Sequence, residues 1–171
     1  MSSSAAVRLG RIAPQDTALF ICDVQERFRS VISGFPAVVD TSRRMARAAQ
    51  ALQLPIIVTE QYPKALGNTV PELAEILPQG TPIVAKTDFS MCVPDVVTEL
   101  EKLSDVKNIL LTGIEAHVCV FQTALDLLGK EERVNFICCV NHFSISIFIQ
   151  HCRKRVCRTH LGGWSIFPTI Y

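Results

Sequence analysis

The sequence has no excess of charge of either sign. Seventeen Lys and Arg residues stand against sixteen Asp and Glu residues, which leaves a formal net charge of +1 over 171 residues. A charge this close to zero provides no general attraction for nucleic acid or for an anionic membrane surface. The expected partner is therefore a small-molecule substrate, with no nucleic acid and no membrane, and a homo-oligomer is left open.

Long apolar runs and paired cysteines are also missing. The most apolar late segment, residues 134–150, is interrupted by Asn135, Asn141 and His142 and is shorter than the roughly 20 residues that span a bilayer. The seven cysteines are scattered without a C-x-x-C pair, which indicates reduced thiols in an intracellular compartment. We expect a cytoplasmic protein, while the Arg- and Ser-rich start and the basic residues 151–158 leave a mitochondrial or nuclear location open.

Four short apolar runs predict buried strands. Residues 17–23 are apolar up to a final aspartate, which is typical of a strand covered on both faces of a parallel sheet. Runs of similar length occupy residues 55–60, 82–86 and 108–113, and each ends in a polar residue or a glycine turn. Residues 134–140 are a candidate for a fifth strand.

Three segments between and after these runs predict helices. Residues 38–52 carry apolar side chains at spacings of three and four, and residues 94–103 do the same with a proline in the first turn. Residues 118–128 are almost entirely apolar, so we expect that helix to be buried. In the first segment the expected apolar face comprises Val38, Val39, Met45, Ala48, Ala49 and Leu52, opposite a wet face with Arg43, Arg44 and Arg47.

The alternation of strands and helices indicates the fold class. Such alternation implies crossover connections and parallel strands. We therefore expect an α/β fold, a three-layer α/β/α sandwich around a mostly parallel, Rossmann-like sheet. With 171 residues, of which 49% are apolar, the chain has material for one core and little room for a second domain.

Polar residues stand where the predicted strands end. In open α/β sheets, ligands bind beyond the carboxyl ends of the strands, which places Asp23, Glu60, Lys86 and the Gly113 turn at the expected site. Position alone leaves a second interpretation open. In that interpretation Asp23 caps a helix and Lys86 is a solvated strand end.

Cys119 is the candidate nucleophile. It follows the fourth predicted strand at the start of the third predicted helix, where unpaired N–H groups and the helix dipole favour a thiolate. A nearby ammonium group from Lys86 would add to this effect. A lone cysteine in an apolar run is ordinarily a small core residue, which is our interpretation of Cys22, Cys138 and Cys139.

Four segments follow one another along the chain and read FICDVQERF at 20–28, VTEQYP at 58–63, KTDFSM at 86–91 and GIEAHVCV at 113–120. They resemble successive motifs of the isochorismatase-like cysteine hydrolase superfamily. Within the superfamily, the chain is most similar to the animal isochorismatase domain-containing proteins. The resemblance covers roughly residues 7–129.

The resemblance implies a catalytic triad. Asp23 would be the general base, Cys119 the nucleophile, and Lys86 the cation that orients Asp23 and supports the thiolate. The resemblance also implies a cis peptide bond between Ile114 and Glu115. The N–H groups of Glu115 and Cys119 would then point at a developing oxyanion.

No metal and no organic cofactor is expected. Some family amidases bind a metal through an aspartate and histidines in the loop after the second strand, and residues 60–67 contain no histidine here. Phe28, Tyr62 and Phe89 could supply apolar walls for a small planar substrate, and His117 could line the same pocket. Core packing or a turn explains each of these four residues equally well.

The resemblance ends after residue 129. There the family has a strand closing on an acidic turn and a Ser-Arg-Ser-like segment, whereas this chain mixes an apolar run with the basic residues 151–158. We expect a hydrolase domain over residues 1–140, incomplete at its C-terminal end and lacking the family's last strand and helix. Residues 141–171 would form a divergent tail.

The retained cysteine indicates the reaction class. True isochorismatases, which hydrolyse a vinyl ether, typically lack this residue, so Cys119 favours hydrolysis of a small amide-like or related C–N substrate through a thioester. The alternative is a non-catalytic protein that keeps the fold as a binding or regulatory platform. Turnover that depends on Cys119 distinguishes the two hypotheses.

Overall fold

The computed structural model describes residues 13–103, 105–130, 136–140 and 147–150. The N-terminal start and the basic residues 151–158, for which expectations were stated above, lie outside these ranges, as does the rest of the expected tail apart from residues 147–150. The domain boundary at residue 140 therefore stays a prediction.

The centre of the molecule is a six-stranded sheet with the strand order β3-β2-β1-β4-β5-β6. The first five strands are parallel to their neighbours, and β6 pairs antiparallel with β5, so the expected mostly parallel sheet is confirmed. The strands are β1 (Thr17–Cys22), β2 (Ile56–Gln61), β3 (Ile83–Lys86), β4 (Asn108–Gly113), β5 (Phe136–Val140) and β6 (Ile147–Gln150).

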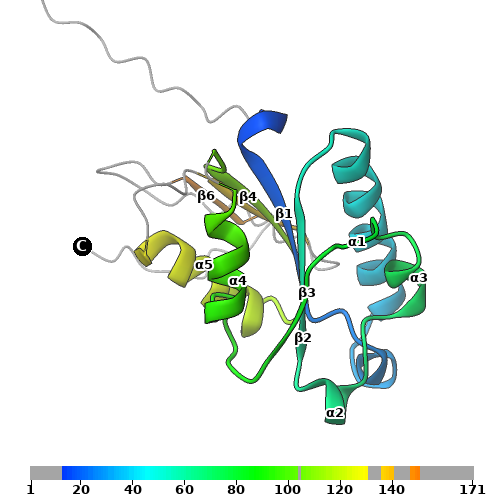
Figure 1. Cartoon of the computed structure of the whole chain (residues 1–171). Coiled ribbons are helices and arrows are strands. Elements are labelled where there is room, and N and C mark those ends of the chain that lie inside the picture. Colours follow the sequence, from blue (N-terminus) through cyan, green and yellow to red (C-terminus); the bar gives the residue numbers. More distant parts are fainter. Residues whose placement is uncertain (1–12, 104, 131–135, 141–146, 151–171) are drawn as a thin grey trace, which may run out of the picture.

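Helices cover both faces of this sheet, as expected for three layers (Figure 1). On one side lie α1 (Phe35–Ala51) and α3 (Pro71–Ala74), and on the other lie α4 (Pro94–Glu101) and α5 (Cys119–Lys130). The short elements η1 (Pro14–Asp16), η2 (Glu26–Ser30) and α2 (Pro63–Leu66) complete the described part of the chain.

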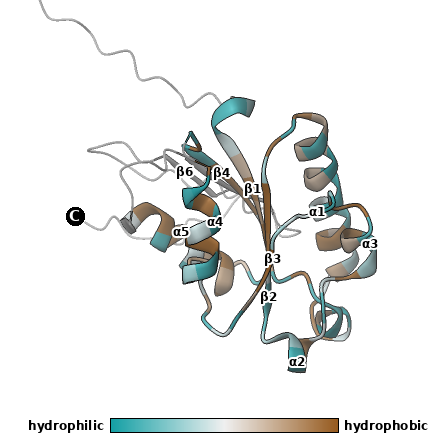
Figure 2. Cartoon of the chain, viewed as in Figure 1, coloured by the Kyte–Doolittle hydropathy of each residue, from teal (hydrophilic) through white to brown (hydrophobic). Residues whose placement is uncertain are grey.

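The alternation of side chains along β1 explains why there are two cores. Ala18, Phe20 and Cys22 pack into the cluster under α4 and α5. Leu19 and Ile21 pack into the cluster under α1 and α3. Successive strand residues point to opposite faces, so a central strand with no polar residue between its ends must be covered on both sides. Figure 2 shows the apolar faces of the helices turned toward the sheet.

The direction of the chain connections reverses between β1 and β4. The chain leaves β1 toward β2 on one side and leaves β4 toward β5 on the other, and the helices that follow, α1 and α5, lie on opposite faces. Such a switch point opens a crevice at the carboxyl ends of the two strands, where ligands bind in folds of this type.

Some expectations about burial were wrong. In α1, Ala48 and Leu52 are exposed, while Ser42 and Ala46 are buried in their place. The helix begins three residues earlier than predicted, at Phe35, which is fully buried.

Two further elements are less buried than predicted. The α5 helix has an exposed face that includes Leu125, because it packs on the sheet with one side only. The β3 strand is an edge strand, and Ile83 is 45% exposed there. Apolar composition alone does not distinguish a central strand from an edge strand. In the described ranges, no helix has the length and apolar character needed to cross a bilayer.

Candidate active site

Asp23 follows β1 directly and is buried, with 1% of its surface exposed. Its backbone takes a left-handed conformation at φ 54°, which Asp and Asn tolerate better than most residues. The Asp23 N–H donates to the Thr59 carbonyl at 3.1 Å. The Thr59 hydroxyl donates to Asp23 Oδ1 at 2.7 Å. Strand β2 therefore fixes both the backbone and one carboxylate oxygen of Asp23.

Lys86 ends β3 and reaches across β2 to the other carboxylate oxygen. Its Nζ lies 2.7 Å from Asp23 Oδ2, and neither side chain is exposed by more than 1%. The ammonium group also donates to Gln61 Oε1 at 2.7 Å and to the carbonyls of Asp88 and Phe89 at 3.0 and 3.1 Å. The interpretation of Lys86 as a solvated strand end is therefore wrong, because the ion pair lies inside the protein.

Two glutamines that the sequence analysis did not single out support this ion pair. Gln61 faces Lys86 in the β2–β3 register and donates from Nε2 to the Thr87 carbonyl at 2.9 Å. Gln25 is fully buried, and its amide exchanges hydrogen bonds with the backbone of Gln61 and donates to the Gly67 carbonyl. Both lie within the motifs at 20–28 and 58–63, and this position is the feature of the sequence by which they could have been found.

Cys119 is the first residue of α5 and is 8% exposed. Its thiol lies near Cys22 and Asp23, because both act on its pKa, and it thus adjoins the carboxylate that Lys86 holds. The Cys22 hydrogen bond is the main cause that lowers the pKa of Cys119 below its usual value, and the Lys86 charge acts in the same direction. Burial and the Asp23 carboxylate oppose this shift.

Cys22 is a core residue, as predicted, but it also belongs to the site. Its side chain is buried in the cluster under α5, and its Sγ lies 3.4 Å from Asp23 Oδ2. Burial is the main cause that raises the pKa of the Cys22 thiol well above its usual value. The side chains of Cys138 and Cys139 lie outside the described part of the structure.

The turn between β4 and α5 presents backbone donors beside the thiol. The Ile114–Glu115 peptide bond is cis, as the resemblance implied. The Glu115 carbonyl accepts the N–H groups of Val118 and Val120, each at 3.1 Å. Within the described residues, the N–H groups of Glu115 and Cys119 have no hydrogen-bond acceptor. These two donors are the pair expected to face an oxyanion.

The four predicted substrate-binding side chains do not gather at one place. Phe28 is half-buried and packs against the core under α1. Phe89 and Tyr62 are 60% and 52% exposed. His117 has 80% of its side chain exposed, and its Nε2 lies 3.4 Å from Glu115 Oε2. Of the four, only Tyr62 lines the cavity described next.

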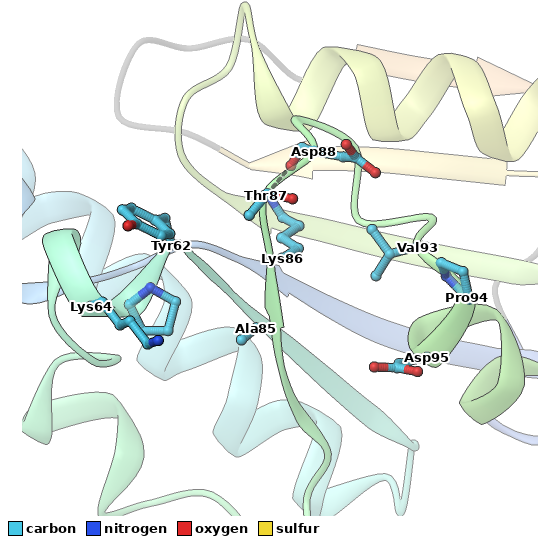
Figure 3. A pocket seen from close by; sticks show the side chains of 10 residues that line it. Tyr62, Lys64, Ala85, Lys86, Thr87, Asp88, Val93, Pro94 and Asp95 are labelled. Atoms are coloured by element: carbon cyan, nitrogen blue, oxygen red, sulfur yellow. Dashed lines mark hydrogen bonds between the residues drawn. The ribbon is translucent and has the colours of Figure 1, made fainter.

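A cavity of about 450 Å³ opens beyond the end of β3, next to Lys86. Figure 3 shows Tyr62 and Lys64 on one side and Pro94 and Asp95 on the other, with the end of β3 between them. Asp23 and Cys119 are not among its lining residues. The cavity therefore adjoins Lys86 without reaching the other two residues of the predicted triad.

Glu60, the other polar strand end, anchors a loop. Its Oε1 accepts the Thr69 N–H at 2.6 Å and the Thr69 hydroxyl at 2.8 Å. This contact closes the loop after β2 over the sheet and leaves Glu60 without a direct contact to Asp23 or Lys86. Among the residues whose positions are described, no three His, Cys, Asp or Glu side chains form a cluster that could hold a metal ion.

Comparison with known proteins identifies the family. The model of the isochorismatase domain matches residues 17–137. Isochorismatase domain-containing protein 2 of Xenopus laevis is 45% identical over 135 residues, which are 78% of this chain and 64% of that protein. Isochorismatase domain-containing protein 2A of Mus musculus is 46% identical over 135 residues, with coverage of 79% and 64%.

A solved structure agrees with this result. The MAR1 ribonuclease of Caenorhabditis elegans is 52% identical, with a TM-score of 0.70, and the match covers 77% of this chain and 65% of that one. The matched part of this chain thus spans just under two thirds of the length of each of these three relatives. From the matching domain model and these relatives, we conclude that the chain belongs to the isochorismatase family and is similar to the animal isochorismatase domain-containing proteins.

Proposed function

We propose that the chain is a cysteine hydrolase that acts on a small amide or a related C–N substrate through a thioester intermediate. One observation carries the proposal. The buried Asp23 carboxylate contacts the Lys86 ammonium at 2.7 Å and adjoins the Cys119 thiol closely enough to act on its pKa. A base, a cation that orients it and a nucleophile thus meet at the ends of three strands, the combination needed for covalent acyl transfer.

The first half of the reaction forms the thioester. Asp23 takes the proton of the Cys119 thiol, and the thiolate sulfur attacks the carbonyl carbon of the substrate. The N–H groups of Glu115 and Cys119 donate to the resulting oxyanion. When the C–N bond breaks, Asp23 returns the proton to the departing amine.

The second half releases the acid. Asp23 takes a proton from a water molecule, and the hydroxide oxygen attacks the thioester carbonyl. The C–S bond breaks, the proton passes to Cys119 and the carboxylic acid leaves. Lys86 keeps its proton throughout, because its role is to hold Asp23 in place.

Cys119 does not line the cavity beside Lys86, so this cavity would hold a part of the substrate away from the reacting carbonyl, and its lining favours a small neutral or cationic group there. Its lining contains the side chains of Lys64, Asp88 and Asp95 in addition to Lys86, and the charge of Lys86 is balanced by Asp23. The remaining charges of the lining are therefore one cation, Lys64, and two carboxylates, Asp88 and Asp95. Tyr62 adds an aromatic surface to the cavity.

The name of the nematode relative suggests a second substrate class. That protein is a ribonuclease by name, whereas contacts to RNA phosphates require Lys and Arg side chains, and the cavity beside Lys86 carries more acid than base. We therefore place RNA second and include it in the test.

The test combines turnover with trapping of the acyl-enzyme. The full chain is incubated with a panel of small amides and, separately, with synthetic RNA, and intact-protein mass spectrometry follows adducts. We expect an acyl adduct on Cys119 and turnover that falls by a factor of about 10⁴ or more in Cys119→Ala. Cys92→Ala is the control, because it removes a thiol that the proposed reaction does not use.

Three results would count against the proposal. Amide turnover that survives in Cys119→Ala would remove the nucleophile. RNA cleavage without any amide turnover would move the chain to the second substrate class. Binding without turnover of either class would favour the non-catalytic platform.

A further inference from the structure

Cys22 lies next to the proposed nucleophile, and the reaction described above leaves it without a role. It is the last residue of β1 and shares a core cluster with Cys119, because the alternation of β1 turns its side chain toward α5. The two thiols are neighbours in this cluster, and each acts on the pKa of the other. The Cys22 sulfur lies 3.4 Å from Asp23 Oδ2, so Cys22 adjoins both the proposed base and the proposed nucleophile.

The backbone around Cys22 is held from both sides. In the sheet register Cys22 stands between Thr59 of β2 and Gly113 of β4. Its carbonyl accepts the Ile114 N–H at 2.9 Å. A Cβ atom on Gly113, where φ is +127°, would lie 2.0 Å from that carbonyl oxygen. The turn that carries Cys119 can therefore approach Cys22 only because residue 113 is glycine.

The environments of the two sulfurs differ in a way that decides which one keeps its proton. Cys22 is fully buried inside the sheet, and burial disfavours its charged form, which raises its pKa. Cys119 is 8% exposed and begins a helix, where backbone N–H groups favour the anion. The charged groups beside this pair are the Asp23 carboxylate and the Lys86 ammonium. Once Cys119 is a thiolate, Cys22 is thus the donor and Cys119 the acceptor.

We propose that Cys22 is a positioning residue of this site, whose thiol donates a hydrogen bond to the Cys119 sulfur and so stabilises and aims the nucleophilic thiolate. The Cys22 proton stays on its own sulfur throughout. While Cys119 is protonated, the Cys22 thiol donates to Asp23 Oδ2; when Asp23 has taken the Cys119 proton, the donor turns to the thiolate. This inference rests on the proposed function only in assigning the Cys119 thiolate a catalytic use. The arrangement of Cys22 beside Cys119 and Asp23 does not require substrate.

The test measures the reactivity of Cys119 against pH in the full chain. Alkylation by iodoacetamide is followed under reducing conditions by peptide mass spectrometry, which separates Cys119 from the other cysteines, in wild type, Cys22→Ala and Cys22→Ser. We expect Cys22→Ala to move the midpoint of the profile upward by about one pH unit, a loss of about tenfold in thiolate at neutral pH. Serine keeps a donor, so Cys22→Ser should stay close to wild type.

Controls separate this role from simple packing. Cys92→Ala should leave the Cys119 profile unchanged. Cys22→Val fills the space of the thiol without donating a hydrogen bond, and it replaces Cys22→Ala in the test if the alanine variant fails to fold. We expect Cys22→Val to shift the profile upward by about the same amount. A profile of Cys22→Ala or Cys22→Val that coincides with wild type overturns the proposal. An equal shift in the alanine and serine variants, in step with their losses of thermal stability, overturns it as well.

The experiment also separates this proposal from the proposed function. Alkylation needs no substrate, so a chain without amide turnover can still show the dependence of Cys119 on Cys22, in which case the enzyme proposal fails alone. Conversely, amide turnover with an unchanged pH profile of kcat in Cys22→Ala defeats the positioning role and leaves the hydrolase intact.

Discussion

The residue that organises the site is Asp23. Its two carboxylate oxygens serve different partners: Oδ1 accepts the Thr59 hydroxyl, while Oδ2 accepts the Lys86 ammonium and adjoins the Cys22 sulfur. A buried charge is tolerated only when it is paired and hydrogen-bonded. Each of the two ions in this pair therefore depends on the other for its place inside the protein.

This dependence predicts the cost of removing one ion. Lys86→Met leaves the Asp23 carboxylate buried without a counter-charge and should lower the free energy of unfolding by about 3–5 kcal/mol. Urea denaturation measures the change. The same substitution in an Asp23→Asn background should cost clearly less, because no charge is then left unpaired.

A surface pair provides the matched control. Arg44 and Asp40 form an i,i+4 pair on α1 with 79% and 50% of their side chains exposed. Arg44→Ala should change the free energy of unfolding by about 0.5 kcal/mol or less. A Lys86→Met variant as stable as Arg44→Ala would contradict the assignment of a buried ion pair.

The interactions of Asp23 also predict that its replacement changes the alkylation rate of Cys119 and the turnover of an amide in opposite directions. Its charge and its hydrogen bond both raise the pKa of Cys119. In Asp23→Asn these effects disappear, and the Lys86 charge remains, so alkylation of Cys119 at pH 7 should become several-fold faster. Turnover of an amide should nevertheless fall by about 10²–10⁴-fold, because the proposed general base is lost.

The choice of asparagine matters for this experiment. Asparagine tolerates the left-handed backbone at position 23, where φ is 54°. A thermal melt close to that of wild type would show that the fold is retained. Slower alkylation together with slower turnover would point to a displaced thiol and count against Asp23 as the base.

At the scale of elements, the site depends on how closely the turn after β4 approaches β1. Gly113 faces Cys22 in the register of the two strands. A side chain at this glycine would overlap the Cys22 backbone, with a Cβ only 2.0 Å from the carbonyl oxygen. Both Asp23 and Cys119 extend from this contact, one from the end of β1 and the other from the turn into α5.

Gly113→Ala should therefore be severely destabilising. The overlap with backbone atoms adds to the cost of a non-glycine residue at φ +127°, and together they should exceed about 3 kcal/mol. Thermal denaturation and the soluble yield measure the effect. Gly80→Ala is the control, since its Cβ meets nothing within 4 Å and only the φ of +82° opposes it, at about 1–2 kcal/mol.

At the scale of the whole molecule, the candidate site is built from the first 119 of the 171 residues. Within the described ranges, the side chains of Asp23 and Lys86 hydrogen-bond with residues between 22 and 89, and Cys119 adjoins Cys22 and Asp23. The later strands β5 and β6 extend the sheet on the side of β4 that faces away from β1. They widen the sheet without contributing a described group to the site.

This arrangement predicts the effect of shortening the chain. A variant that ends at residue 150 keeps all six strands and should alkylate Cys119 at a rate within about twofold of the full chain, because the local groups that set its pKa remain. Ending the chain at residue 140 removes β6 and exposes β5 as an edge, so that variant should aggregate more readily in light scattering. A tenfold loss of Cys119 reactivity in the longer variant would show that the later residues complete the site.

Local patterns were sufficient for the strands and for the position of the site. Apolar runs of strand length predicted β1 to β4, and polar residues at their ends predicted where Asp23, Lys86 and Cys119 would meet, because parallel strands bring their carboxyl ends to one edge. Patterns failed where burial depends on neighbours. Ala48, Leu52 and Leu125 are exposed although they lie in apolar helical sequence, since each helix packs through one side only.

The order of the strands and the side-chain contacts across them became visible only in the folded chain. Lys86 reaches Asp23 over 63 positions of sequence, and it does so because β2 lies between β1 and β3. The contact between Cys22 and Cys119 likewise requires β4 beside β1 and α5 on the face to which Cys22 points. Hydrophobic periodicity indicates which side of an element faces the core. Which buried residues touch depends on strand order and on the close approach at Gly113, and these arise from packing between segments far apart in the chain.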